Sequence, residues 1–156
     1  MPQKQLSHEQ AVQFLTEENV GHLATTDSGG APYITPLHYI YRDGKIYFHC
    51  ANEGQKLANI AANPRVCFAV DRLHKLVFFS AACKASSRYT SVLVFGMAEI
   101  VTDLQQKLAI LETITAKLAE GRAFPPIPAA AAAGCTVVAI RIETIHGKQN
   151  VDPAEP

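Results

Sequence analysis

The chain has 156 residues, of which 48% are hydrophobic and 18% are charged. This composition is typical of one folded domain with a buried core, and it argues against global disorder. Lysine plus arginine and aspartate plus glutamate both number 14, so the formal net charge is zero. Proteins that coat nucleic acid usually carry a basic excess, so nucleic acid is not expected as a partner.

The cysteines and the N-terminal segment indicate a cellular compartment. Cys50, Cys67, Cys83 and Cys135 form no C-x-x-C pair, and the first three lie in apolar runs, where a thiol usually behaves as a small buried hydrophobe. The first residues lack the apolar stretch of a signal peptide, and no apolar run reaches the length of a membrane span. We therefore expect a reduced, soluble, cytoplasmic protein that does not bind membranes.

The first part of the chain predicts a helix followed by short strands. Ser7 and Gln10 form a capping-box pair ahead of apolar residues at helical spacing, which predicts a helix over residues 7–18. Two prolines interrupt the run 31–42, so this strand must begin irregularly or lie at a sheet edge. The other elements predicted up to residue 64 are strands over 21–26 and 45–50 and a short helix that Asn52 caps and Asn63-Pro64 ends.

The second part predicts further strands around one long helix. Residues 65–71, 75–83, 89–101 and 135–145 are rich in strand-forming residues. Asp103 and Gln106 resemble a helix cap, and apolar residues at helical spacing predict an amphipathic helix that ends at Gly121. Residues 122–134 contain three prolines and a run of five alanines, and we interpret them as a connector.

About six or seven strands with hairpin-length connections predict a largely antiparallel sheet, and a partly open barrel is its natural closure. Helices do not alternate with the strands, which disfavours a doubly wound α/β fold. The predicted fold class is therefore mainly β with flanking helices, an antiparallel split β-barrel. We expect one domain over residues 1–149 and a flexible tail over residues 150–156.

Asp43-Gly44 is the strongest hairpin signal in the chain, and it predicts which residues face each other. If these two residues form the loop, His38 lies opposite His49, unless a β-bulge shifts the register. Alternation places both histidines on the less apolar face and Phe48 and Cys50 on the core face. Three interpretations remain open. The histidines are exposed without a role, they line a cofactor, or, least favoured because a third ligand is missing, they bind a metal.

Residues 52–56, Asn-Glu-Gly-Gln-Lys, lie at the start of the second predicted helix. Free backbone N–H groups there, with Gly54 for close approach and Lys56 for charge, would hold a phosphate. The alternative is a solvated lysine on a short helix, and the full P-loop pattern is missing. Because the segment follows His49 closely, one ligand could contact both His49 and this segment.

Ser91 lies at the polar start of a predicted strand. It would suit a phosphate or a heterocycle, or it belongs to a solvated strand end.

Seven short segments occur in an order that is specific, although each segment alone is weak. They are Gly21-His22-Leu23-Ala24-Thr25, Gly30-Ala31-Pro32-Tyr33, Pro36-Leu37-His38-Tyr39, Tyr47-Phe48-His49-Cys50-Ala51, Gly54-Gln55-Lys56-Leu57, Asn63-Pro64-Arg65-Val66 and Tyr89-Thr90-Ser91-Val92 with Gly96. Together they resemble the pyridoxamine 5'-phosphate oxidase-related FMN-binding split barrels, nearest the branch that includes the nitroimidazole-resistance proteins. The resemblance covers about residues 8–148.

The resemblance implies a homodimer with two FMN molecules at the subunit interface. It also implies a set of cofactor contacts. Lys56 and Gln55 would hold the FMN phosphate. The residues along the flavin ring and ribityl chain would be Pro36, Leu37, His38, His49, Cys50 and Ala51, with a polar contact from Ser91 and Lys148 approaching from the partner subunit.

The activity implied by the resemblance is that of a flavoprotein oxidoreductase, for example a reductase of nitroaromatic or similar small molecules. His49 and His38 would donate protons or tune the flavin ring. A haem-binding or haem-handling protein and a non-catalytic flavin-binding module are the alternatives. Two departures from the oxidases matter. The tail has only Arg141 in place of their arginine-rich substrate motif, which argues against pyridoxamine-phosphate oxidation. Gly54-Gln55-Lys56 replaces Ser-Arg-Lys, which removes one cation and predicts weaker FMN binding.

Overall fold

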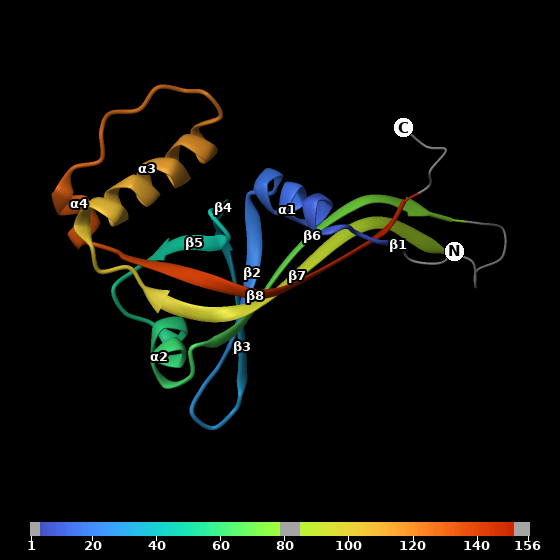
Figure 1. Cartoon of the computed structure of the whole chain (residues 1–156), viewed down its shortest axis with the longest axis horizontal. Coiled ribbons are helices and arrows are strands. Elements are labelled where there is room, and N and C mark those ends of the chain that lie inside the picture. Colours follow the sequence, from blue (N-terminus) through green and yellow to red (C-terminus); the bar gives the residue numbers. More distant parts are fainter. Residues whose placement is uncertain (1–3, 79–84, 152–156) are drawn as a thin grey trace.

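The computed structural model describes residues 4–78 and 85–151. Within these ranges the chain forms four helices and one eight-stranded sheet, in which β1 pairs with β8 and the other strands follow the order β3-β2-β6-β7-β8-β5-β4 (Figure 1). In chain order the elements are β1 (Lys4–Gln5), α1 (His8–Glu17), β2 (Val20–Thr26), β3 (Pro32–His38), β4 (Ile40–Arg42), β5 (Lys45–Cys50), α2 (Gln55–Ala62), β6 (Arg65–Val77), β7 (Ser86–Ile100), α3 (Leu104–Ala119), α4 (Ala129–Ala133) and β8 (Thr136–Asn150).

The sheet curls into a barrel that stays open along one line. Its end strands, β3 and β4, are separated only by Tyr39, so the two ends of the sheet meet at this residue. Every described strand pair is antiparallel, and none joins β3 to β5. The predicted fold class, an antiparallel split barrel with flanking helices, is confirmed.

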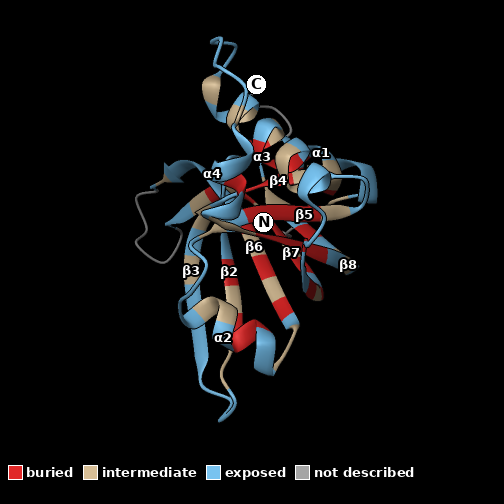
Figure 2. Ribbon diagram, turned by 90° about the vertical axis from the view of Figure 1, so that its left-hand side faces the viewer, coloured by how far each residue is buried: buried red, intermediate tan, exposed pale blue. Residues whose placement is uncertain are grey.

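Two apolar clusters stabilise the fold, one inside the barrel and one between the sheet and α3 with α4 (Figure 2). Alternate residues of β5 divide between them. Phe48 is fully buried in the barrel, as predicted, whereas Tyr47 belongs to the second cluster together with Ile40. The middle of the face predicted to be less apolar is therefore covered by α3 and α4, whereas His38, Arg42 and His49 of that face are exposed. No helix within the described ranges is long and apolar enough to cross a membrane.

Local capping signals placed two helices correctly. Ser7 caps α1 with the full capping box to Gln10, and Asp103 caps α3 by accepting a hydrogen bond from the Gln106 backbone. The alanine run, interpreted as part of a connector, instead forms the short helix α4.

The strands β6, β7 and β8 are longer than predicted, and together they extend beyond the barrel as an arm (Figure 1). β6 continues through an irregularity between Leu73 and Lys75 where two separate strands were predicted. The end of the second predicted strand, residues 79–83, lies outside the described residues. β8 includes Asn150, which bonds to the Ser87 carbonyl at 2.7 Å, so this residue is not part of a tail.

Candidate functional site

The candidate site lies along the split between β3 and β5. The predicted hairpin register holds for the three β4–β5 pairs next to the loop, but the ladder ends at Tyr39. His38 belongs to β3 and pairs with Val20, whereas His49 pairs with Val137 of β8. The prediction that His38 lies opposite His49 in one hairpin is therefore wrong, because β3 leaves β5 and pairs with β2.

The two histidines are nevertheless electrostatic neighbours. Burial lowers the pKa of His49 below its ordinary 6.5, and the proximity of His38 lowers it further, so His49 is mostly neutral at pH 7. His38 Nδ1 lies 3.2 Å from the backbone oxygen of Asn19. A carbonyl only accepts hydrogen bonds, so neutral His38 carries its proton on Nδ1 and leaves Nε2 as an acceptor. The split thus holds one neutral imidazole, that of His49, and one ring nitrogen that can accept a hydrogen bond, Nε2 of His38.

The first turn of α2 is open to an anion. Its N-cap is Gly54, whose φ of 135° favours glycine, and no side chain caps the helix. Asn52, predicted as the cap, is used elsewhere: its amide donates to Ala133 O at 3.1 Å and its oxygen accepts from Thr136 at 3.0 Å. The backbone N–H groups of Gln55 and Lys56 therefore keep their donor capacity, whereas those of Leu57 and Ala58 donate to the Gly54 carbonyl.

Lys56 adds a positive charge to this turn. Among the described residues, no carboxylate lies within ion-pair distance of its ammonium group. Lys56 is also close enough to Cys50 to oppose the rise in the pKa of the thiol that burial causes. The end of β5 and the start of α2 thus form one continuous surface with a helix N-terminus and a cation, the combination that binds phosphate.

Four of the predicted site residues, His38, His49, Cys50 and Lys56, lie close together in the split. Their neighbours in sequence differ in exposure: Leu37 is half-buried against the barrel core, while Pro36 and Ala51 are exposed. Gln55 is exposed at the first position of α2.

Ser91 and Lys148 lie far from this cluster within one chain. They face each other across β7 and β8, and Lys148 Nζ lies 5.9 Å from the centroid of the Tyr89 ring. Lys148 is roughly 35 Å along β8 from Val137, the partner of His49, at about 3.3 Å per residue. A single copy of the chain does not bring these two residues to the split.

Sequence reasoning missed a buried polar pair beneath α2. Asn59 and Thr25 are 1% and 2% exposed, and Asn59 Nδ2 donates to Thr25 Oγ1 at 2.9 Å. Asn59 Oδ1 accepts from Gln55 Nε2 at 2.7 Å. An asparagine on the apolar side of a short helix was the available signal. Its partner, 34 residues away in the sequence, was not.

Comparisons with known proteins agree with this architecture. The profile of the pyridoxamine 5'-phosphate oxidase family matches residues 7–149. No curated protein matches the sequence significantly.

Among solved structures, one similar protein is a candidate 5-nitroimidazole antibiotic resistance protein from Bacteroides thetaiotaomicron, with 23% identity and a TM-score of 0.81 over 96% of this chain and 89% of that protein. An FAD-binding protein from Mesorhizobium loti has 27% identity and a TM-score of 0.71 over 97% and 100%. An FAD and haem binding protein from Mycobacterium smegmatis has 19% identity and a TM-score of 0.86 over 97% and 75%. Because the family profile covers nearly the whole sequence, the chain belongs to the pyridoxamine 5'-phosphate oxidase family.

Proposed function

We propose that the protein is a flavin-binding oxidoreductase that holds FMN in the split between β3 and β5. The observation that carries this proposal is the first turn of α2, where uncapped backbone donors and Lys56 lie beside the end of β5. A phosphate held there leaves the ring and ribityl chain to extend toward His49 and His38. A bound flavin would supply hydride or single-electron transfer to a small molecule, for example a nitroaromatic compound.

The two histidines supply what a reductase needs from its protein. His49 stays neutral near pH 7 because burial and His38 both lower its pKa. His38 Nε2 accepts a hydrogen bond when neutral and donates one when protonated, while Asn19 fixes the orientation of the ring through Nδ1. Proton transfer to a reduced substrate is therefore assigned to His38, with His49 as a neutral neighbour that tunes the ring environment.

The proposal includes a homodimer, and the outer face of the sheet supports it. Two neighbouring cross-strand rows run over five strands on this face. The rows are Pro36, His22, Ala69, Leu93 and His146, and Ile34, Ala24, Cys67, Phe95 and Thr144. In the second row, Ile34 on the end strand β3 is 64% exposed, and Phe95 on the inner strand β7 is 42% exposed. Large apolar side chains that share one exposed face are typical of an interaction surface.

The same face carries four predicted flavin contacts, of which Pro36 belongs to the first row itself. His38, Ser91 and Lys148 each lie two residues along their strands from a member of the first row, so their side chains share its side of the sheet. In one chain Lys148 is remote from α2. A second copy packed on this face would bring its own Lys148 toward the split of the first, which is why the complete site is assigned to the dimer.

The proposal is tested by the visible absorption spectrum of the freshly purified protein, repeated after adding FMN, FAD and haem. We expect a flavin spectrum and a preference for FMN over riboflavin that Lys56→Met removes, because riboflavin lacks the phosphate. A Soret band without flavin would replace the flavin by haem, with histidines as iron ligands. Protein that takes up neither chromophore would disprove the proposal.

A second measurement separates an enzyme from a passive flavin carrier. Reduced flavin in the wild-type protein should be reoxidised by a nitroaromatic acceptor, and His38→Ala should slow this step without releasing FMN. If His38→Ala and His49→Ala both keep FMN and full turnover, the histidines have no part in proton transfer.

A further inference from the structure

We propose that Thr25 and Asn59 are positioning residues for the phosphate end of the flavin site, and this inference rests on the proposed function. They connect the sheet to Gln55, the first residue of α2, through a chain of three hydrogen bonds, of which the central one, from Asn59 to Thr25, is buried. Neither residue is exposed enough to contact a ligand itself, since Asn59 and Thr25 are 1% and 2% exposed. Their effect on a bound anion must therefore act through Gln55.

The direction of every hydrogen bond in this chain follows from its first acceptor. The Tyr33 carbonyl can only accept, so the Thr25 hydroxyl donates to it, at 3.5 Å. The Thr25 oxygen is then free to accept from Asn59 Nδ2, at 2.9 Å. This turns the Asn59 side-chain oxygen toward the start of its own helix, where it accepts from Gln55 Nε2 at 2.7 Å. A backbone carbonyl of β3 thus determines which end of the Gln55 amide is held.

This arrangement has two consequences at the helix start. Because Asn59 lies four residues further along α2, its bond holds the Gln55 side chain along the flank of the helix. An unheld glutamine amide at this position could instead lie over the helix start, where its oxygen would compete with an anion for the free N–H groups. In addition, Gln55 Nε2 uses one of its two protons for Asn59, so the other remains a donor.

A second hydrogen bond between β2 and α2 allows an experiment to distinguish this positioning role from simple anchoring of the helix. The next residue of β2, Thr26, accepts a hydrogen bond from Asn63 Nδ2 at 3.0 Å. Asn63 is the C-cap of α2, so this second bond has the same chemistry and joins the same two elements. It ends at the opposite end of the helix and has no connection to Gln55. The pair Thr25 and Thr26 is therefore a built-in control.

The test measures the dissociation constants of FMN and riboflavin for the wild-type protein, Thr25→Val, Asn59→Leu, Thr26→Val and Asn63→Leu. We expect Thr25→Val and Asn59→Leu to weaken FMN binding by about five- to tenfold, the size of one ordinary lost hydrogen bond, with little change for riboflavin. Thr26→Val and Asn63→Leu should lower stability and leave the ratio of the two constants unchanged. Thr25→Ser, which keeps the hydroxyl, should keep the wild-type ratio.

A flavin-free readout accompanies the titrations. In NMR spectra of the unliganded protein, the side-chain amide resonances of Gln55 should shift in Thr25→Val and stay in place in Thr26→Val. If Thr25→Val does not fold, Thr25→Cys replaces it, because a thiol accepts only weakly.

The outcomes distinguish the two proposals. A wild-type protein without any preference for FMN over riboflavin contradicts the proposed function. A wild-type preference that Thr25→Val or Thr25→Cys and Asn59→Leu retain overturns the positioning role, as does an equal loss of FMN and riboflavin affinity in all of the variants.

Discussion

His38 lowers the pKa of His49 although the two histidines lie on strands that do not pair with each other. His38 disfavours a proton on His49, and this effect adds to desolvation, the larger cause of the lowered pKa of His49. We predict that His38→Gln raises the pKa of His49 but leaves it below 6.5, because burial remains. Titration of the imidazole resonances by NMR measures this directly.

His22→Gln is the control for this titration, because His22 is an exposed histidine that does not contribute to the pKa of His49. A His49 pKa that stays constant or falls in His38→Gln would contradict the prediction.

The lowered pKa of His49 also determines how the stability of the protein depends on pH. Since the folded-state pKa of His49 lies below its ordinary value of 6.5, its contribution to stability is present above pH 6.5 and is lost as the pH falls through the folded-state pKa. His38→Gln should make this loss smaller, because it brings the folded-state pKa of His49 closer to 6.5.

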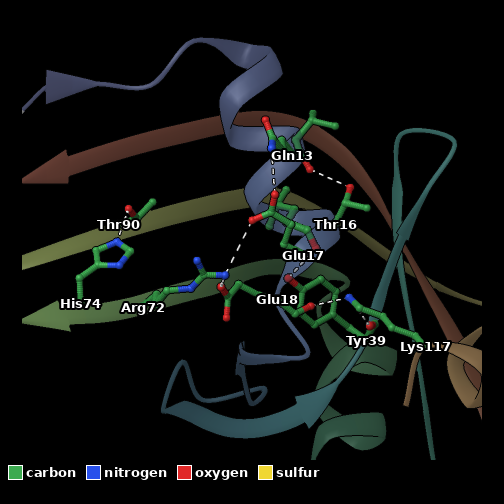
Figure 3. Close-up of polar contacts among 11 residues, drawn as sticks. Gln13, Thr16, Glu17, Glu18, Tyr39, Arg72, His74, Thr90 and Lys117 are labelled. Carbon is green, nitrogen blue, oxygen red and sulfur yellow. Dashed lines mark hydrogen bonds and ion pairs between the residues drawn. The ribbon is translucent and has the colours of Figure 1, made fainter. Parts of the chain in front are cut away.

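Lys117 joins α3 to Tyr39, where the two ends of the sheet meet (Figure 3). Its ammonium group donates to the backbone oxygens of Glu18 and Tyr39 and lies 4.7 Å from the centroid of the Tyr39 ring. We predict that Lys117→Met lowers the free energy of unfolding by about 2 kcal/mol, because two half-buried carbonyls lose a charged donor. Urea denaturation at pH 7 provides the measurement.

Lys107→Met is the matched variant for this experiment, since Lys107 donates to a single carbonyl, that of Cys135 at 2.9 Å. Its loss should be smaller. If both variants lose the same stability, the contacts of Lys117 with Tyr39 contribute nothing beyond one ordinary hydrogen bond.

The parts of this fold that could be predicted from the sequence are those determined by nearby residues. The Ser7 capping box and the Asp43-Gly44 loop act over a few positions, and the structure reproduces both. The same loop did not reveal where its ladder ends. That end is set at Tyr39 by the competing pairing of β3 with β2, a relationship between distant segments. The long β6 was divided in the prediction because an irregularity at Leu73 to Lys75 resembles a strand end in the sequence.

In the candidate site, too, features set by nearby residues could be predicted, and features that depend on distant segments could not. Gly54 and Lys56 lie within one turn of helix, and their spacing alone indicated an anion site that the uncapped helix start supports. Asn59 could not be identified in this way, because its hydrogen-bond partner Thr25 comes from another strand. Lys148 illustrates the limit most clearly. Its predicted role depends on a second subunit, which no pattern within one chain can place.

Gly96 lies where the β7–β8 register shifts, and it has no room for a side chain. A Cβ atom there would collide with the backbone oxygen of Arg141 on β8 and lie 3.1 Å from a methyl group of Ile140. Because backbone must move to relieve the clash, Gly96→Ala should cost about 1–3 kcal/mol of stability. Thermal denaturation measures this loss. Gly29→Ala, whose nearest neighbouring atom is 3.4 Å from the added carbon, should change stability by less than about 0.5 kcal/mol. If both substitutions changed stability equally, the sheet around Gly96 would accommodate the added methyl group without strain.

Phe95 provides the sharpest test of the dimer. It lies on the outer sheet face with 42% of its surface exposed and its ring 6.0 Å from that of His146. If a second copy covers this face, Phe95→Glu places a carboxylate in an apolar contact and should weaken dimerisation by about a hundredfold or more. Light scattering coupled to size-exclusion chromatography should then report the monomer mass.

The control is Phe124→Glu, which introduces the same charge at a phenylalanine of similar exposure, 37%, in the segment between α3 and α4. It should leave the dimer intact. Because the complete flavin site is assigned to two subunits, Phe95→Glu should also lower FMN affinity, and raising its concentration until dimers form again should restore binding. A Phe95→Glu protein that is monomeric yet binds FMN as tightly as the wild type would show that one chain suffices, and Lys148 would then have no place in the site.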